Sequence, residues 1–291
     1  MKLCTSVSPA WRAQKLSDRE LYSHIRDCGF SLICGELNAP MEDAEIEQFL
    51  ASLKDAGVRL VKERTSITGK EKLLPILKTC RKLGVSKLVI PLLSDENWKR
   101  EDYMEQNAAY LKSLAPIAKE NGVTLLIEAA GDFQNAHYTH GSMELIYLID
   151  RAGEDSILVN LNVGNLGMTD VDLYPEVRLL RDRLGSVDMN DNFFGMALGI
   201  DKQREDLAFA PLMGFLDYDE VMRGLTEIGY DGEVNLLINY PRVVKKESRH
   251  ITERRFDTFP LPLLKQFTVW TANVTRFMLT SYHVSIEEAE A

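Results

Sequence analysis

The segment Ala118-Lys-Glu-Asn-Gly-Val-Thr-Leu-Leu-Ile-Glu128 carries the pattern from which the fold can be predicted. Its polar start suits the end of a helix, and Gly122 follows, since glycine adopts the positive φ of a helix end without steric cost. The stretch Thr124–Glu128 has an apolar centre, Leu-Leu-Ile, which is typical of a strand buried on both faces of a parallel sheet. The segment therefore predicts a helix, a glycine and a buried strand, the repeating unit of an α/β fold.

The same pattern recurs along the chain. We expect a helix to end at each of seven glycines: Gly29, Gly57, Gly84, Gly122, Gly153, Gly185 and Gly229. The apolar runs after them, with one more at the N-terminus, predict strands at Lys2–Val7, Ser31–Glu36, Val58–Glu63, Ser86–Pro91, Thr124–Glu128, Ile157–Asn162, Ser186–Asn190 and Glu233–Asn239. Strands that alternate with helices in this way favour parallel pairing through right-handed crossovers.

Eight such units that close on themselves make a (β/α)8 TIM barrel, which is the fold we predict. The alternative is an open doubly wound sheet, which carries a glycine-rich phosphate turn after its first strand. The first turn here, Val7-Ser-Pro-Ala-Trp-Arg12, has no glycine, and this favours the barrel. We expect a single domain over residues 1–291, with a last helix over about 260–281 and a frayed acidic tail over 286–291.

Composition excludes several classes of protein. The 291 residues are 45% apolar and 27% charged, as in an ordinary soluble protein rather than a disordered or fibrous one. The net charge of −10 disfavours a nucleic-acid or anionic-membrane partner. The sequence shows no secretory signal and no membrane span, and its four cysteines form no C-x-x-C pair. These features predict a cytoplasmic protein with reduced thiols.

Polar residues interrupt the apolar strands where the mouth of the barrel is expected. A buried carboxylate is rare without a role, so Glu128 and Asp188 are candidates for acid and base catalysis. Four asparagines share the same strand ends: Asn160, Asn162, Asn190 and Asn239. They could bind substrate hydroxyls, or they could hydrogen-bond to one another and fix the register of the barrel.

Cationic and titratable residues lie near the same expected mouth. Lys62, Glu63 and Arg64 end the third strand, and Arg242 follows the eighth. Lys62 and Arg242 are candidates to bind a substrate carboxylate or phosphate, or to stabilise an enediolate. The charged stretch Arg242–Arg255 predicts a solvated loop or helix.

Two histidines, His137 and His140, lie in the loop after Glu128. Loops over the mouth of a barrel concentrate catalytic residues, and histidine titrates near neutral pH. Either histidine could therefore transfer a proton, or both could be solvated surface residues.

Four segments, in this order, resemble strand ends of the xylose-isomerase-like barrel superfamily of sugar isomerases and epimerases: Ala118–Glu128, Leu158–Leu166, Val187–Asn192 and Gly229–Leu237. The resemblance extends from Met1 to about Tyr240. It implies a TIM barrel that acts on a sugar.

The resemblance also implies a divalent metal held by Glu, Asp, His and Glu at four strand ends. The corresponding residues here are Glu128, Asn162, Asp188 and Leu237, so one of the four ligands is preserved. Leucine cannot coordinate a metal, and asparagine offers a neutral carbonyl. What the residues leave open is a weak Mn²⁺ or Mg²⁺ site made by Glu128, Asn162 and Asp188.

We therefore expect an isomerase, epimerase or lyase that moves a proton next to the carbonyl of a keto-sugar, polyol or sugar acid. The alternative is a non-catalytic carbohydrate-binding pseudoenzyme that has lost the metal centre. An abasic-site nuclease of the same superfamily would need a histidine-rich zinc centre and a basic groove, and the sequence has neither. The strongly apolar last helix also predicts a homodimer contact.

Overall fold

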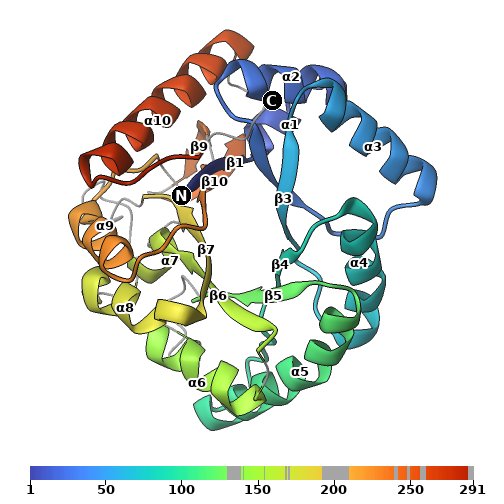
Figure 1. The fold of residues 1–291 in the computed structure, drawn as a ribbon, viewed down its shortest axis with the longest axis vertical. Coiled ribbons are helices and arrows are strands. Elements are labelled where there is room, and N and C mark those ends of the chain that lie inside the picture. Colours follow the sequence, from blue (N-terminus) through green and yellow to red (C-terminus); the bar gives the residue numbers. More distant parts are fainter. Residues whose placement is uncertain are drawn as a thin grey trace.

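The eight expected strands form one closed parallel barrel in the computed structural model (Figure 1). They are β1 Lys2–Ser6, β2 Leu32–Glu36, β3 Arg59–Arg64, β4 Lys87–Val89, β5 Thr124–Ile127, β6 Ile157–Asn162, β7 Leu184–Met189 and β8 Glu233–Leu236. Neighbours in sequence are neighbours in the ring, and β1 closes it by pairing with β8 from Lys2↔Glu233 to Thr5↔Leu236. The predicted (β/α)8 barrel is confirmed, and the open sheet is excluded.

The structure describes residues 1–129, 139, 141–153, 155–167, 169, 171–191, 210–238 and 260–287, together with the backbone of 242–247 and 250–255. Three candidate site residues, His137, His140 and Asn239, lie outside the described residues. The backbone of Arg242 is described and its side chain is not.

Helices surround the barrel on its outside (Figure 1). They are α1 Pro9–Arg12, α2 Asp18–Asp27, α3 Asp43–Asp55, α4 Lys70–Leu83, α5 Arg100–Glu120, α6 Ser142–Ala152, α7 Val163–Gly167, α8 Leu173–Leu180, α9 Tyr218–Glu227 and α10 Leu261–Ser281. The apolar core fills the space between the two layers, where side chains such as Ile25, Leu111 and Leu148 are fully buried. In the part of the chain that the structure describes, no helix has the length and apolar character to cross a membrane.

Six of the seven expected glycines follow helices with a positive φ: Gly29, Gly57, Gly84, Gly122, Gly153 and Gly229. The expectation for Gly185 is wrong, because this residue lies inside β7. A Cβ there would lie 2.5 Å from Cδ2 of Leu126, so close packing in the barrel, rather than a helix end, requires the glycine. The preceding helix α8 ends instead at Leu180, and Arg181, the residue after it, takes a φ of 34°.

The expectation for the charged stretch Arg242–Arg255 is also wrong. This stretch forms an antiparallel pair of strands, β9 Arg242–Glu247 and β10 His250–Arg255. The β-branched residues among its charges, such as Val243, Val244 and Ile251, favour strands over a helix.

The last helix α10 spans Leu261–Ser281, close to its expected range. Three large apolar side chains at intervals of seven residues are exposed on it: Leu263, Trp270 and Phe277, the last with 73% of its surface accessible. The homodimer contact stays a prediction. All four cysteines are free and buried.

Candidate functional site

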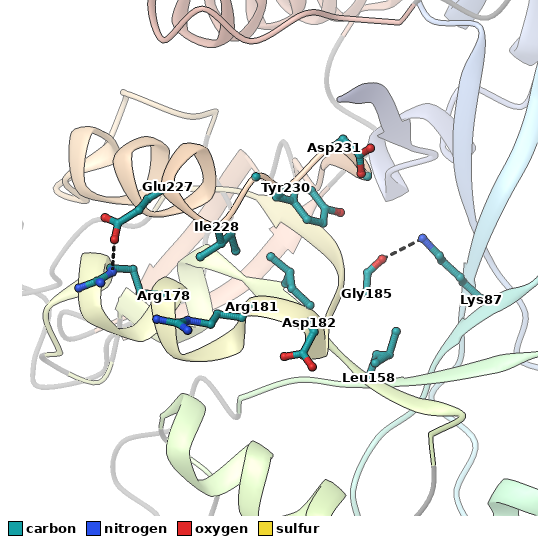
Figure 2. Close-up of a pocket in the computed structure, with 13 residues that line it drawn as sticks. Lys87, Leu158, Arg178, Arg181, Asp182, Gly185, Glu227, Ile228, Tyr230 and Asp231 are labelled. Carbon is teal, nitrogen blue, oxygen red and sulfur yellow. Dashed lines mark hydrogen bonds and ion pairs between the residues drawn. The ribbon is translucent and has the colours of Figure 1, made fainter.

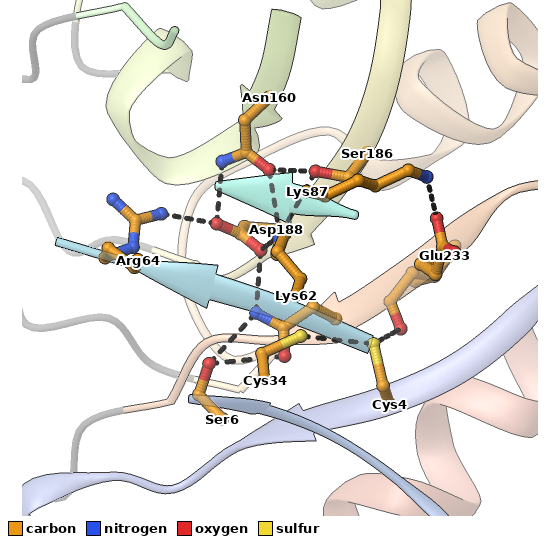
Figure 3. Close-up of polar contacts among 12 residues, drawn as sticks. Cys4, Ser6, Cys34, Lys62, Arg64, Lys87, Asn160, Ser186, Asp188 and Glu233 are labelled. Atoms are coloured by element: carbon orange, nitrogen blue, oxygen red, sulfur yellow. Dashed lines mark hydrogen bonds and ion pairs between the residues drawn. The ribbon is translucent and has the colours of Figure 1, made fainter. Parts of the chain in front are cut away.

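Polar side chains from several strands meet inside the barrel (Figure 3). Because side chains alternate along a strand, two residues of β3 that lie two positions apart point to the same side, and both enter this network. Its members are Lys62 and Arg64 from β3, Asn160 from β6, Ser186 and Asp188 from β7, Asn235 from β8, and Glu128 just after β5.

Asp188 is the centre of the network and is fully buried. Its Oδ1 accepts hydrogen bonds from Lys62 Nζ at 2.6 Å and Asn235 Nδ2 at 2.7 Å. Its Oδ2 accepts from Arg64 Nη2 at 2.6 Å and Asn160 Nδ2 at 2.7 Å. Burial alone would raise the pKa of Asp188, but the charges of Lys62 and Arg64 hold it well below its usual range. Asp188 is therefore ionised at neutral pH, and its oxygens are fully used by protein donors.

Lys62 lies beneath the mouth, with 2% of its side chain exposed. Besides Asp188, its Nζ donates to Asn160 Oδ1 at 2.9 Å and to Ser186 Oγ at 3.1 Å. An ammonium has three N–H groups, and these three bonds use them all. Burial would lower the pKa of Lys62, but the charge of Asp188 raises it above its ordinary value. This lysine is a buried structural cation, and its donors are not available to a ligand.

Arg64 and Glu128 form the part of the network that reaches the mouth. Their side chains are 29% and 18% exposed. Arg64 Nη1 donates to Glu128 Oε1 at 2.5 Å, and Nη2 donates to Oε2 at 2.9 Å. This is the parallel fork geometry that makes arginine–carboxylate pairs strong. Asn160 Nδ2 also donates to Glu128 Oε2, at 2.9 Å.

Arg64 is not among the candidates that the sequence suggests, although it ends a strand together with Lys62. The sequence feature that could have identified Arg64 is its position two residues after Lys62, because residues two apart in a strand point to the same side. Asn235 and Ser186 are likewise absent from those candidates. They contact Asp188 and Lys62 respectively, from positions deep in the barrel.

The predicted asparagines have different roles in the structure. Asn160 joins the network of carboxylates and cations. Asn162 Oδ1 instead accepts the backbone N–H of Asn165 at 3.1 Å, and Asn190 Oδ1 accepts that of Gly164 at 3.1 Å. The last two asparagines thus hold the turn of α7 against the barrel.

A small cavity opens beside Glu128, with a volume of about 230 Å³. Its wall includes the apolar segment Ile90–Leu93 after β4, and Tyr103 from α5. Thr139 and Asn165 contribute polar groups on the side of Glu128. Pockets for drug-sized ligands begin at about 300 Å³, so this space suits a smaller molecule.

A larger cavity of about 750 Å³ lies at the opposite end of the barrel (Figure 2). Lys87 at the start of β4 and Gly185 near the start of β7 line it. Two of its cations form ion pairs: Lys87 with the nearby Glu233, and Arg178 with Glu227 at 2.8 Å. In TIM barrels the amino ends of the strands serve stability and the carboxyl ends carry the chemistry. The cavity beside Glu128 is therefore the candidate active site.

The residues at the mouth do not fit a divalent metal. Among the described residues there is no group of three or more His, Cys, Asp or Glu side chains that could hold one. The oxygens of Asp188 are used by nitrogen donors, and those of Glu128 accept from Arg64 and Asn160. The oxygen of Asn162 caps a turn. The expected weak site of Glu128, Asn162 and Asp188 thus has too few free ligand positions, because among its carboxylates one acceptor position, on Glu128 Oε1, is left by the described donors.

Solved structures share this fold at low sequence identity. D-psicose 3-epimerase crystallised in the presence of D-fructose matches with a TM-score of 0.75 and 16% identity, over 96% of this chain and 99% of that one. IolI protein with a bound zinc atom matches with 0.71 and 15%, over 98% and 100%. The 3-keto-D-glucoside 4-epimerase from E. coli matches with 0.68 and 14%, over 94% and 99%.

Sequence comparisons give a complementary result. A search of curated proteins finds no match. The profile of a family described as xylose isomerase-like TIM barrel matches residues 23–255, which is most of the chain and includes strands β2 to β8. The chain therefore belongs to the xylose isomerase-like TIM barrel family.

Proposed function

We propose that this protein is a sugar isomerase or epimerase that moves a proton at the carbon next to the carbonyl group of a small keto-sugar or sugar acid. The observation that carries the proposal is the position of Glu128. Its carboxylate lines the cavity at the mouth and is held in place by two hydrogen bonds from one arginine. The epimerase names among the structural neighbours support the choice of substrate class.

Glu128 would act as the general base. An ionised carboxylate offers about two acceptor positions on each oxygen. Oε2 already accepts from Arg64 and Asn160, whereas Oε1 accepts from Arg64 alone. The remaining position on Oε1 is the one that would take a proton from a substrate carbon.

Arg64 would stabilise the negative charge that develops on the substrate oxygen. A guanidinium carries five N–H groups, and three bonds to Glu128 and Asp188 account for three of them. A fixed cation beside a developing enediolate lowers the barrier, because its field is in place before the reaction. Lys62 lies too deep for this role, since its three donors are engaged.

Epimerisation also needs a second group that returns a proton. His137 and His140 follow β5 in sequence, and we propose them as candidates for that group. Asn239 and Arg242 follow β8, and we propose that they bind hydroxyl or carboxylate groups of the substrate.

The alternative function is carbohydrate binding without catalysis. It is favoured by the use of both Asp188 oxygens within the protein, which leaves Glu128 as the one carboxylate in the described network that could accept a proton. The two functions share the site and the ligand class and differ in whether a carbon–hydrogen bond breaks.

Solvent-deuterium exchange distinguishes the two functions. The protein is incubated in D₂O with D-fructose, D-tagatose, D-psicose and L-ribulose, and deuterium at carbon is measured by NMR. We expect exchange into at least one ketose, and a loss of about 100-fold or more for Glu128→Gln. Glu233→Gln, at a carboxylate paired with Lys87 at the other end of the barrel, should keep the rate.

Two outcomes would contradict the proposed enzyme. Binding of a ketose without any exchange would favour the carbohydrate-binding alternative. Exchange that persists undiminished in Glu128→Gln would show that another group is the base.

A further inference from the structure

We propose that the guanidinium of Arg64 and the ammonium of Lys62 replace a divalent cation at the mouth of this barrel, and that neutralising residue 64 converts the mouth into a Mn²⁺ site. The inference goes beyond the proposed function, since it applies equally to an enzyme and to a binding protein. It rests on the charges at the mouth, on the position of Arg64 between two carboxylates and on the hydrogen bonds that occupy the carboxylate oxygens.

The charges at the mouth balance as they would around a divalent ion. Two carboxylates, Glu128 and Asp188, meet two protein cations, Lys62 and Arg64. Buried carboxylates are strongly destabilising unless they are paired or bound to metal. The pair of cations supplies the same charge as one divalent metal would, and it is permanently attached to the chain.

One nitrogen of Arg64 occupies a bridging position. Its Nη2 lies 2.9 Å from Glu128 Oε2 and 2.6 Å from Asp188 Oδ2, so it joins one carboxylate that follows β5 to another near the end of β7. Metal–oxygen distances for a hard cation such as Mg²⁺ are about 2.1 Å. A metal ion at this point would need the two oxygens to approach by about half an ångström to one, which small side-chain movements can provide.

The second side chain that takes the place of the divalent cation is Lys62. It holds the other oxygen of Asp188, Oδ1, from beneath. Loss of the Arg64 charge would therefore leave Asp188 partly neutralised and Glu128 without a cation. The described network would then carry one excess negative charge. Glu128 Oε2 and Asp188 Oδ2 would face the position that the Arg64 guanidinium had occupied. Such a pair of carboxylate oxygens attracts a hard cation.

Titration with Mn²⁺ tests the replacement. Chelator-treated wild-type protein and Arg64→Met are titrated with Mn²⁺, and free Mn²⁺ is followed by electron paramagnetic resonance. We expect no site in the wild type tighter than about 1 mM, and one site per chain in Arg64→Met at least tenfold tighter than any in the wild type. Mn²⁺ should also raise the melting temperature of the variant alone, because a ligand that binds the native state stabilises it.

Three controls locate the new site. Arg64→Lys keeps a cation at the mouth and should gain no Mn²⁺. Arg151→Met removes an exposed arginine paired with Glu105 at 3.0 Å, and it should also gain none. The double variant Arg64→Met with Glu128→Gln should lose the Mn²⁺ that the single variant gained.

Two results would overturn the proposal. One is a stoichiometric Mn²⁺ site in the wild type that Glu128→Gln abolishes. The other is a folded Arg64→Met that binds no Mn²⁺. If that variant does not fold, the comparison of wild type with Glu128→Gln decides alone. Because no sugar is used, failure of ketose exchange leaves this test unaffected.

Discussion

Titratable side chains on the two sides of strand β3 differ in whether burial leaves them charged. Toward the barrel axis, Lys62 and Arg64 bind carboxylates and keep their charges. Toward the helices, Glu63 is 3% exposed, and its Oε2 has no hydrogen-bond partner among the described residues. Burial raises the pKa of Glu63 to about 8, although the charge of Arg12 opposes the rise. A buried group keeps its charge when donors or counter-ions surround it, and otherwise tends toward its neutral form.

The largest effect on stability is expected from breaking the ion pair of Lys62 and Asp188 inside the barrel. Lys62→Met would leave Asp188 with one cation fewer in a fully buried position, so we expect a loss of about 3–5 kcal/mol in the free energy of unfolding. Guanidinium unfolding followed by circular dichroism measures it. Arg183→Met, which removes an exposed partner of Asp150, should lose less than about 1 kcal/mol. Similar losses in the two variants would show that the inner charges are not effectively desolvated.

Glu63, on the helix side of β3, should make the protein less stable as pH rises, whereas a carboxylate paired with a cation makes it more stable. The pKa of Glu63 is about 8 in the folded state, whereas in the unfolded chain it has its ordinary value of 4.5. Between these values the folded state binds more protons, so stability falls as pH rises, by at most about 1.4 kcal/mol per pH unit.

Thermal unfolding between pH 5 and pH 9 measures that slope, and Glu63→Gln should flatten it. Asp188 has a lowered pKa, so its contribution is present above about pH 4 and is lost only under strong acid. It therefore adds no slope in the window assigned to Glu63. A slope that is unchanged in Glu63→Gln would mean that other groups produce it.

The smallest effect is expected at Gly35, the neighbour of Glu63 on β2. A Cβ at residue 35 would lie 2.5 Å from both carboxyl oxygens of Glu63. The carboxyl group must move to admit it, so Gly35→Ala should destabilise the protein by about 1 kcal/mol. Chemical unfolding of this variant and of Gly35→Ala combined with Glu63→Ala checks the cause. Destabilisation by Gly35→Ala that is no smaller in a Glu63→Ala background would place the clash elsewhere.

Local patterns in the sequence were sufficient to predict the barrel. A glycine such as Gly122 and the apolar run after it are contiguous, so helix ends and strands follow from short segments. Gly185 shows the limit of that reasoning. Its need for glycine comes from close contacts with Leu126 and Leu158, which are distant in the chain and reach it because β5, β6 and β7 are consecutive strands of the ring.

The candidate site could be predicted in part. Glu128 and Asp188 stand out as polar residues in apolar strands, and the structure brings them into one network through Arg64 and Asn160. The separate use of Asn162 could not be foreseen, because its partner is a backbone N–H at the start of a turn. Strand ends that look alike in sequence differ in what faces them across the ring.

The sequence by itself determined eight βα units, because each depends on interactions between residues that are close in the chain. It also determined that carboxylates and cations would lie near the ends of three alternate strands, β3, β5 and β7. The tertiary structure alone decided that Arg64 pairs with Glu128 and Asp188, which are 64 and 124 residues away. Charges this far apart in sequence meet only when the ring closes, and the energy of a buried charge depends on which partners it then meets.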